Sequence, residues 1–357
     1  MKDILTKRIP SLDGLRALSI LFVVLGHAFH IKIVDIANLG VRIFFIISAY
    51  LIVGILLRDV ERNRFSIKTF YFKRFSRTFP AFYIYLGILY FVLRYFNLFE
   101  WEQFWRAPIY LENYHSRTLW NSKQWFVGHT WSLAVEEQFY ILIALLFYFF
   151  NCKIITRKQI IYILIFVVLL VPVIRVCYMF FHNIPAFLRN SIHRSFETVA
   201  DSLSIGGLLA ISSLRVKESK FYHFFENKYW ILLLVIFFLQ LLNASWLVRI
   251  IGLKIRYVYN LLGLTLLNIS IALLILILIN NPTKTFFSRF INQKIMVKIG
   301  LWSYSIYLWQ QIWLYDWNIP LIVKFLGIFL CSILSYYFIE IKFLSWRDSI
   351  LSRNERN

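Results

Sequence analysis

The stretch SLDGLRALSILFVVLGHAFHI, residues 11–31, decides the fold. Apolar side chains fill most of it, and its length suits one helical crossing of a lipid bilayer. It also carries two ionisable side chains, Arg16 near one end and His27 near the other. Such groups are costly in the hydrocarbon region, so two of them on one span indicate a functional role.

The spacing of Arg16 and His27 places both side chains on one face of the helix. Eleven residues at about 100° each make roughly three turns, and the two positions lie roughly 16 Å apart along the axis. A simpler interpretation stands beside this one. An arginine near a helix end commonly extends toward lipid headgroups, and a single histidine in a membrane is often a hydrogen-bonded structural residue.

The composition indicates a membrane protein. Hydrophobic residues make up 60% of the 357 residues, and the mean hydropathy is +0.65. The net charge of +21 comes from short basic runs between apolar segments, which is typical of a polytopic membrane protein and not of a nucleic-acid-binding domain. The three cysteines have no metal-binding spacing, so neither a metal site nor a disulfide framework is expected.

Apolar runs long enough to cross a bilayer occur about ten times, which predicts an all-α bundle of about ten transmembrane helices. The predicted spans are 12–31, 38–57, 78–98, 130–150, 158–181, 196–214, 229–248, 258–280, 297–317 and 319–340. We expect one transmembrane domain over residues 1–357 with no appended soluble domain, because only a short polar segment follows the tenth span.

The distribution of basic residues predicts the orientation of these spans. The connections on one side, among them 58–77 and 281–298, carry most of the lysines and arginines outside the spans. Because cytoplasmic loops are enriched in basic residues, both termini are expected in the cytoplasm. An even number of crossings agrees with that placement.

This orientation predicts two levels of polar side chains. Glu136 and Glu137 in the fourth span, Asp201 in the sixth and Gln310 in the ninth fall in the outer half of the bilayer, as His27 does. Convergence of costly polar groups from several helices at one depth favours a site over scattered structural pairs.

A second cluster is expected near the cytoplasmic face, where Arg16 lies. Arg74 and Arg77 are three residues apart at the end of the connection 58–77. Arginines at that spacing share a helix face and can hold phosphate oxygens. Ordinary basic enrichment of a cytoplasmic loop would produce the same pattern.

Six strings in order along the chain carry a resemblance to a known family. They are SLDGLRALSILFVVLGHA with Arg16 and His27, FKRFSRTFPAFY with Arg74 and Arg77, WSLAVEEQFY with Glu136 and Glu137, ETVADSLSIGGLLA with Asp201, SYSIYLWQQ with Tyr304 and Gln310, and YYFIEIKFL at 336–344. Together they resemble acyltransferase family 3, membrane-bound O-acyltransferases that modify bacterial surface glycans.

The chain also departs from the family pattern. It has Gln310 where the family usually has histidine, Arg42 where aspartate is common, Ser48-Ala49-Tyr50 in place of a Ser-Gly-Phe string, and Lys342 in place of proline. Glutamine keeps a hydrogen-bond donor and an acceptor but does not carry a proton. These changes bear on the acceptor and the acyl group more than on the class of reaction.

The resemblance implies transfer of an acyl group, expected to be acetyl, from cytoplasmic acyl-CoA to a hydroxyl of a surface or lipid-linked glycan. It places the protein in the bacterial inner membrane, with acetyl-CoA as a donor substrate and no tightly bound cofactor. His27 would act as a general base or carry the acyl group, with Glu136 or Glu137 orienting it. The substrate-binding set would be Arg16, Arg74, Arg77, Asp201, Tyr304 and Gln310.

Two other classes of function remain possible from the residues alone. A proton-coupled transporter or flippase of a glycan or lipid also uses intramembrane His, Arg and Glu. The sequence shows no inverted repeat and no matching pair of broken helices, which speaks against that class. A structural membrane protein would leave the polar residues at shared depth without an explanation.

Overall fold

The computed structural model, which describes residues 9–29, 35–115, 126–180, 192–252, 254–315 and 317–354, is built of helices and the turns and loops that connect them. No β-strand occurs among these residues. The all-α prediction is therefore confirmed. Helices are assigned to the membrane by their length and apolar composition.

The first part of the chain forms six long helices. They are α1 (Pro10–Phe29), α2 (Ile36–Glu61), α3 (Ile67–Tyr95), α6 (Trp131–Asn151), α7 (Arg157–Phe180) and α9 (Phe196–Lys217). Between α3 and α6 lie the short helix α4 (Trp101–Phe104) and a 3₁₀ turn, η1 (Gly128–Thr130), that leads directly into α6.

The second part of the chain is more interrupted. Its helices are α10 (Lys220–Asn227), α11 (Tyr229–Leu242), α12 (Ser245–Ile251), α13 (Lys254–Val258), α14 (Leu264–Asn280), α15 (Phe286–Ile291), α16 (Lys294–Leu314), α17 (Leu321–Ser335) and α18 (Ile341–Asn354). The π-helical turns η2 (Tyr259–Gly263) and η3 (Tyr336–Glu340) join α13 to α14 and α17 to α18 into continuous helices.

Eight helices of the described chain are long and apolar enough to cross a membrane, and a ninth is counted if α10 and α11, which meet at 89°, form one broken span. The sequence predicted about ten. The remaining predicted span is α16, which has 21 residues but is not among the candidates by composition. Lys, Ser, Tyr, Trp and Gln side chains lower its hydropathy, and several of them line the site described below.

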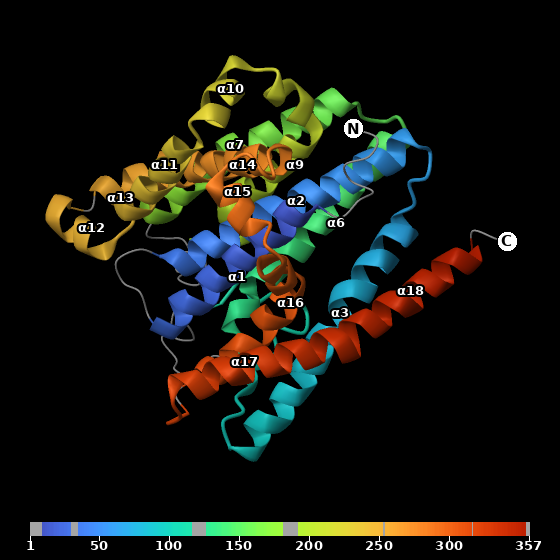
Figure 1. Cartoon of the computed structure of the whole chain (residues 1–357), viewed down its shortest axis with the longest axis vertical. Coiled ribbons are helices and arrows are strands. Elements are labelled where there is room, and N and C mark those ends of the chain that lie inside the picture. The colour runs from blue at the N-terminus through green and yellow to red at the C-terminus, as the bar shows by residue number, and fades with distance from the viewer. Residues whose placement is uncertain are drawn as a thin grey trace.

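The centre of the bundle is α1, which packs between α2 and α16, while α2 packs against α9 and α9 against α7 (Figure 1). Close approach of α1 and α16 depends on glycine. A Cβ atom built on Gly300 of α16 would lie 1.8 Å from the backbone oxygen of Asp13. At the neighbouring contact of α1 with α15, one built on Gly14 would lie 1.8 Å from the backbone oxygen of Ile291. Small residues at such crossings let helix backbones touch.

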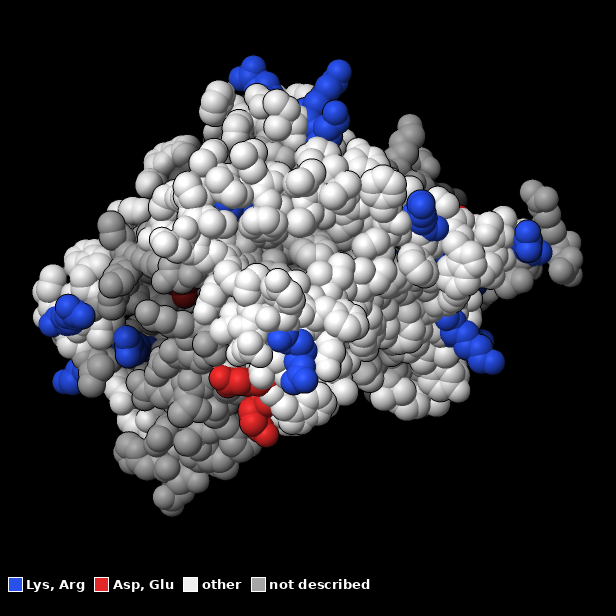
Figure 2. Space-filling model, turned by 90° about the horizontal axis from the view of Figure 1, so that it is seen from below, with Lys and Arg blue, Asp and Glu red and all other residues white. Residues whose placement is uncertain are grey.

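The outer surface of the bundle is largely apolar. Figure 2 shows a broad uncharged face with Lys and Arg mostly at its margins. Large side chains such as Phe91, Leu169, Leu326 and Phe338 are each more than half exposed. A surface of this kind is stable against lipid and not against water, so the fold is that of a polytopic membrane protein.

Candidate functional site

A cavity of about 90 Å³ lies where α1, α2, α3, α6 and α16 meet. Five of the residues that the sequence singled out line it: Arg16, Arg74, Arg77, Glu136 and Tyr304. That volume has room for several water molecules. Residues more than 280 positions apart in the chain thus come together around one polar space.

Arg74 and the two glutamates form a buried ion-pair cluster beside this cavity. Arg74 Nε donates to Glu137 Oε1 at 3.1 Å, and Nη2 donates to Glu136 Oε2 at 3.4 Å. The ring of Tyr140 lies beneath the guanidinium, with 4.1 Å between the ring centroid and Cζ, and its hydroxyl donates to Glu136 Oε2 at 3.2 Å. Arg74 is therefore held from three sides.

This geometry corrects two expectations. Arg74 was expected in a cytoplasmic connection and the glutamates at a different depth, where one of them would orient His27. Instead α3 begins at Ile67, so Arg74 lies two turns inside a helix, where a guanidinium needs a carboxylate partner. Within the described residues, neither Glu136 nor Glu137 is hydrogen-bonded to His27.

The other two arginines differ from Arg74 in their partners. Arg16 lies 3.7 Å from Asp13, a longer ion pair on the same helix. Arg77 is exposed, and among the described residues no carboxylate lies within 4.0 Å of it. The cavity thus offers one weakly paired and one unpaired guanidinium, which is an arrangement that can bind an anion.

Tyrosine and serine hydroxyls complete the walls of the cavity. Tyr304, from the predicted set, donates to the backbone oxygen of Thr78 at 2.8 Å and so joins α16 to α3. Ser48, which the sequence marked only as a departure from the family pattern, lines the cavity and shares a short hydrogen bond with Tyr140, which was not predicted. Tyr140 follows Glu136 by four residues, and this i,i+4 spacing on one helix face could have identified it.

His27 lies beyond this cavity and contacts Gln310 of α16, with 3.3 Å between Nδ1 and Oε1. Gln310 is fully buried. The structure therefore brings together the histidine of the first span and the glutamine of the ninth, which were expected at one depth.

A second histidine, His129 in η1, lies close enough to His27 for the two imidazoles to interact electrostatically. The hydroxyl of Tyr307, which lines the cavity, donates to the backbone oxygen of His129. Tyr307 also shares a hydrogen bond of 2.6 Å with Ser132, a further lining residue. Tyr307 thus connects the wall of the arginine cavity to the turn that carries His129. His129 was missed, although it stands just before the string WSLAVEEQFY.

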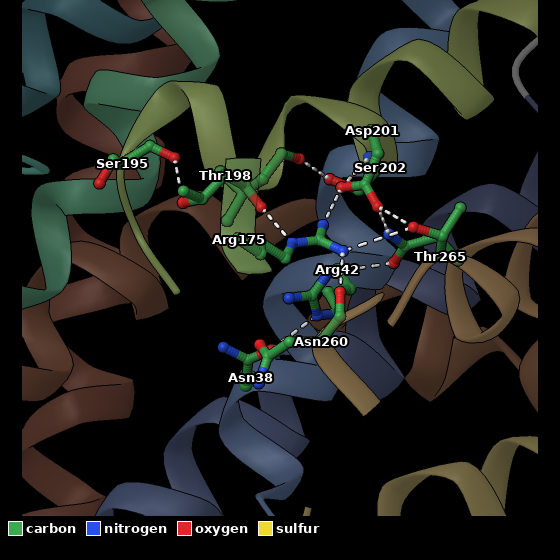
Figure 3. Close-up of polar contacts among 11 residues, drawn as sticks. Asn38, Arg42, Arg175, Ser195, Thr198, Asp201, Ser202, Asn260 and Thr265 are labelled. Atoms are coloured by element: carbon green, nitrogen blue, oxygen red, sulfur yellow. Dashed lines mark hydrogen bonds and ion pairs between the residues drawn. The ribbon is translucent and has the colours of Figure 1, made fainter. Parts of the chain in front are cut away.

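Asp201 is not brought to this cavity. It is fully buried in a separate network (Figure 3), where Arg175 Nη2 donates to Oδ1 at 2.5 Å and Thr265 and Asn268 donate to Oδ2 at 2.8 and 3.1 Å. Arg42 joins the same network through Asn268, at 3.2 Å. These contacts tie α2, α7, α9 and α14 together, and both carboxylate oxygens of Asp201 accept hydrogen bonds.

No group of three or more His, Cys, Asp or Glu side chains within the described ranges is placed to hold a metal ion. The polar groups around the cavity instead supply positive charge and hydroxyls, and the imidazoles of His27 and His129 lie outside its lining. That set suits binding of an anionic substrate and movement of a proton.

Comparison with known proteins agrees with this chemistry. The family model described as an acyltransferase domain, of type 3, matches residues 9–344. A protein of Staphylococcus aureus strain COL, provisionally named an O-acetyltransferase, is 28% identical over 96% of this chain and 59% of its own length. The O-acetyltransferase OatA of S. aureus strain NCTC 8325 is 28% identical over 93% of this chain and 56% of its own length.

A third relative is the peptidoglycan O-acetyltransferase OatA of Listeria monocytogenes, 32% identical over 38% of this chain and 24% of that protein. The chain spans somewhat less than three fifths of the length of the S. aureus relatives that it matches along most of its length. No solved structure matches it.

Proposed function

Because the chain belongs to acyltransferase family 3, we propose that it is an O-acyltransferase that transfers an acetyl group from acetyl-CoA to a hydroxyl of a cell-envelope glycan. The donor binds from the cytoplasmic side and the acceptor from the opposite side. This protein acts in the bacterial cytoplasmic membrane with both termini in the cytoplasm.

The observation that carries the proposal is the position of the arginine cavity relative to His27. Arg16 lines the cavity and His27 follows it by eleven residues on the same helix. Coenzyme A has its phosphates at one end of a long, thin arm and the thioester at the other. A donor whose phosphates are held at the arginines would therefore extend along α1 toward His27, over roughly 16 Å.

The arginines have different parts in this proposal. Arg77 and Arg16 bind donor phosphates, because neither is fully neutralised by a close carboxylate. Arg74, with Glu136 and Glu137, braces α3 against α6 and keeps the cavity wall in place. Tyr304 stabilises the same wall through the hydrogen bond that its hydroxyl donates to the backbone oxygen of Thr78.

His27 is the general base that takes the proton of the acceptor hydroxyl. Imidazole is suited to this role because it gains and loses a proton near neutral pH. The glycan acceptor rests on the names of the relatives, one of which is a peptidoglycan O-acetyltransferase. Asp201 keeps its predicted role as a contact of the glycan acceptor only in a conformation in which its hydrogen bonds to Arg175, Thr265 and Asn268 are broken.

The test is acyl transfer in inverted membrane vesicles supplied with isotope-labelled acetyl-CoA, with label counted in the glycan fraction. We expect His27→Ala to abolish incorporation at unchanged protein yield. His223→Ala is the matched control, since His223 is exposed on α10 and remote from the cavity. Equal incorporation by His27→Ala, or none above empty vesicles by the wild type, would reject the proposal.

A further inference from the structure

Buried polar atoms without a partner gather at the His27 end of the bundle. Two buried side-chain nitrogens there, Trp309 Nε1 and Gln310 Nε2, have no hydrogen-bond partner among the described residues, and the imidazole of His129 lies in the same region. Tyr85 links this group, because its ring contacts those of His129 and Trp309 with centroids 5.9 and 5.4 Å apart. Leaving such atoms unpaired costs about 1–3 kcal/mol each, so their concentration points to a polar ligand.

Gln310 has one engaged and one unengaged end. Its Oε1 meets His27 Nδ1 at 3.3 Å, whereas its Nε2 has no partner among the described residues and the side chain is 0% exposed. An amide oxygen can only accept, so Nδ1 of His27 carries the ring proton and the lone pair lies on Nε2. The glutamine thus fixes the tautomer that a general base needs.

Resting on the proposed function, we infer that Gln310 is a catalytic residue with two roles. Its Oε1 positions His27, and its Nε2 donates a hydrogen bond to the carbonyl oxygen of the acyl group during transfer. The imidazole of His129, which is close enough to that of His27 to interact with it electrostatically, adds to the polar lining of this acyl-transfer site.

The step balances with the groups that are present. The acceptor oxygen bonds to the thioester carbonyl carbon while its proton passes to His27 Nε2. Negative charge develops on the carbonyl oxygen and is met by the N–H of Gln310 Nε2. The carbon–oxygen double bond then re-forms, the carbon–sulfur bond breaks, and the sulfur takes the proton from His27, which yields the ester and coenzyme A.

An amide is suited to this second role. It keeps the donor fixed, because its other end is already bonded to His27, and it does not add charge to a buried site. A preorganised donor of this kind typically accounts for a rate factor of about 10²–10³. The amide N–H of Gln310 also lies close to the imidazole of His27, as a reaction that uses both groups on one carbonyl requires.

The experiment compares four substitutions in the vesicle assay. Gln310→Glu keeps an acceptor for His27 Nδ1 but removes the donor, so kcat should fall about 100-fold while KM for acetyl-CoA changes less than about threefold. The acidic limb of its pH–kcat profile should move to higher pH, because the carboxylate stabilises the imidazolium.

Gln310→His, which has both a hydrogen-bond donor and an acceptor, should recover most of the rate, and Gln310→Leu should not. Gln311→Glu, on a different helix face, is the charge control.

The outcomes separate this inference from the proposed function. If the wild type transfers acetyl and His27→Ala does not, but Gln310→Glu keeps the wild-type kcat, the role of Gln310 is rejected and the acetyltransferase stands. If Gln310→His is as slow as Gln310→Leu although both elute as monodisperse protein, the hydrogen-bonding role is likewise rejected. A wild type without transfer would remove both.

Discussion

At the scale of single residues, the structure separates two arginines that look equivalent in the sequence. Arg74 and Arg77 are three positions apart on α3, yet Arg74 is bonded to two carboxylates and Arg77 to none within the described chain. Glu136 and Glu137 thus pair with Arg74 and not with His27, which the sequence suggested as their partner. Gln310, where the family usually has histidine, contacts His27 instead.

This difference predicts that neutralising Arg77 affects binding of acetyl-CoA, whereas neutralising Arg74 affects stability. Arg77→Gln should raise KM for acetyl-CoA about tenfold at unchanged thermal stability, because a phosphate contact in part-exposed surroundings is lost. Arg74→Gln should lower the melting temperature in detergent, because removing one partner of a buried ion pair costs about 3–5 kcal/mol. Kinetics with labelled acetyl-CoA measure KM, and fluorescence-monitored unfolding measures the melting temperature.

Two further variants control that comparison. Arg353→Gln removes an exposed cation at the end of α18 and should change neither quantity. Glu137→Gln added to Arg74→Gln should recover part of the lost stability, because one buried carboxylate is no longer left charged. An equal rise in KM for both arginine variants, with no loss of stability for Arg74→Gln, would contradict the division of roles.

At the scale of elements, the site depends on how closely α1 and α16 approach. Arg16 and His27 come from α1, and Tyr304, Tyr307 and Gln310 come from α16. The two helices touch at Gly300 of α16, where there is no room for a Cβ atom, and Gly14 of α1 touches Ile291 at the end of α15 in the same way. Because helices are rigid over these lengths, a change at the crossing moves every one of these side chains.

We therefore expect Gly300→Ala to impair both stability and acetyl transfer. Its methyl group would lie 1.8 Å from the Asp13 backbone oxygen, and relieving such overpacking typically costs about 1–3 kcal/mol. Gly87→Ala is the matched control, because a Cβ atom at this position on α3 would have nothing within 4 Å of it. Detergent melting curves and the vesicle assay measure the two effects. Similar melting temperatures for both variants would contradict the importance of this crossing.

At the scale of the whole molecule, the proposed donor path requires a definite orientation in the membrane. The arginine cavity must face acetyl-CoA, and both termini must then share the cytoplasmic side. The apolar outer face and the basic margins of the molecule (Figure 2) are compatible with a membrane setting, while the orientation itself rests on the charge of the connections.

Labelling of Cys152 tests that orientation. Cys152 is exposed at the end of α6, in a connection predicted to be cytoplasmic. A membrane-impermeant maleimide should therefore label it in inverted vesicles and not in intact spheroplasts. Glu100→Cys in a Cys152→Ser background, placed in the predicted outer connection, should show the reverse pattern. Labelling of Cys152 in spheroplasts would overturn the topology and the cytoplasmic entry of the donor.

The sequence by itself determined the class of structure and most members of the site. Hydropathy and spacing are properties of local segments, because each apolar run must satisfy its own backbone hydrogen bonds in lipid. They gave an all-α membrane bundle and placed Arg16 and His27 on one helix. The family strings also named Arg74, Arg77, Glu136 and Tyr304, all of which line the cavity.

Only the tertiary structure decided which of these residues meet. Whether Glu136 binds His27 or Arg74 depends on where α3 begins and how deeply it inserts against α6, and a few residues of shift change the depth of a side chain by several ångströms. The isolation of Asp201 in a separate network and the pairing of His27 with Gln310 likewise follow from packing. Contacts between distant segments depend on helix positions that no single segment encodes.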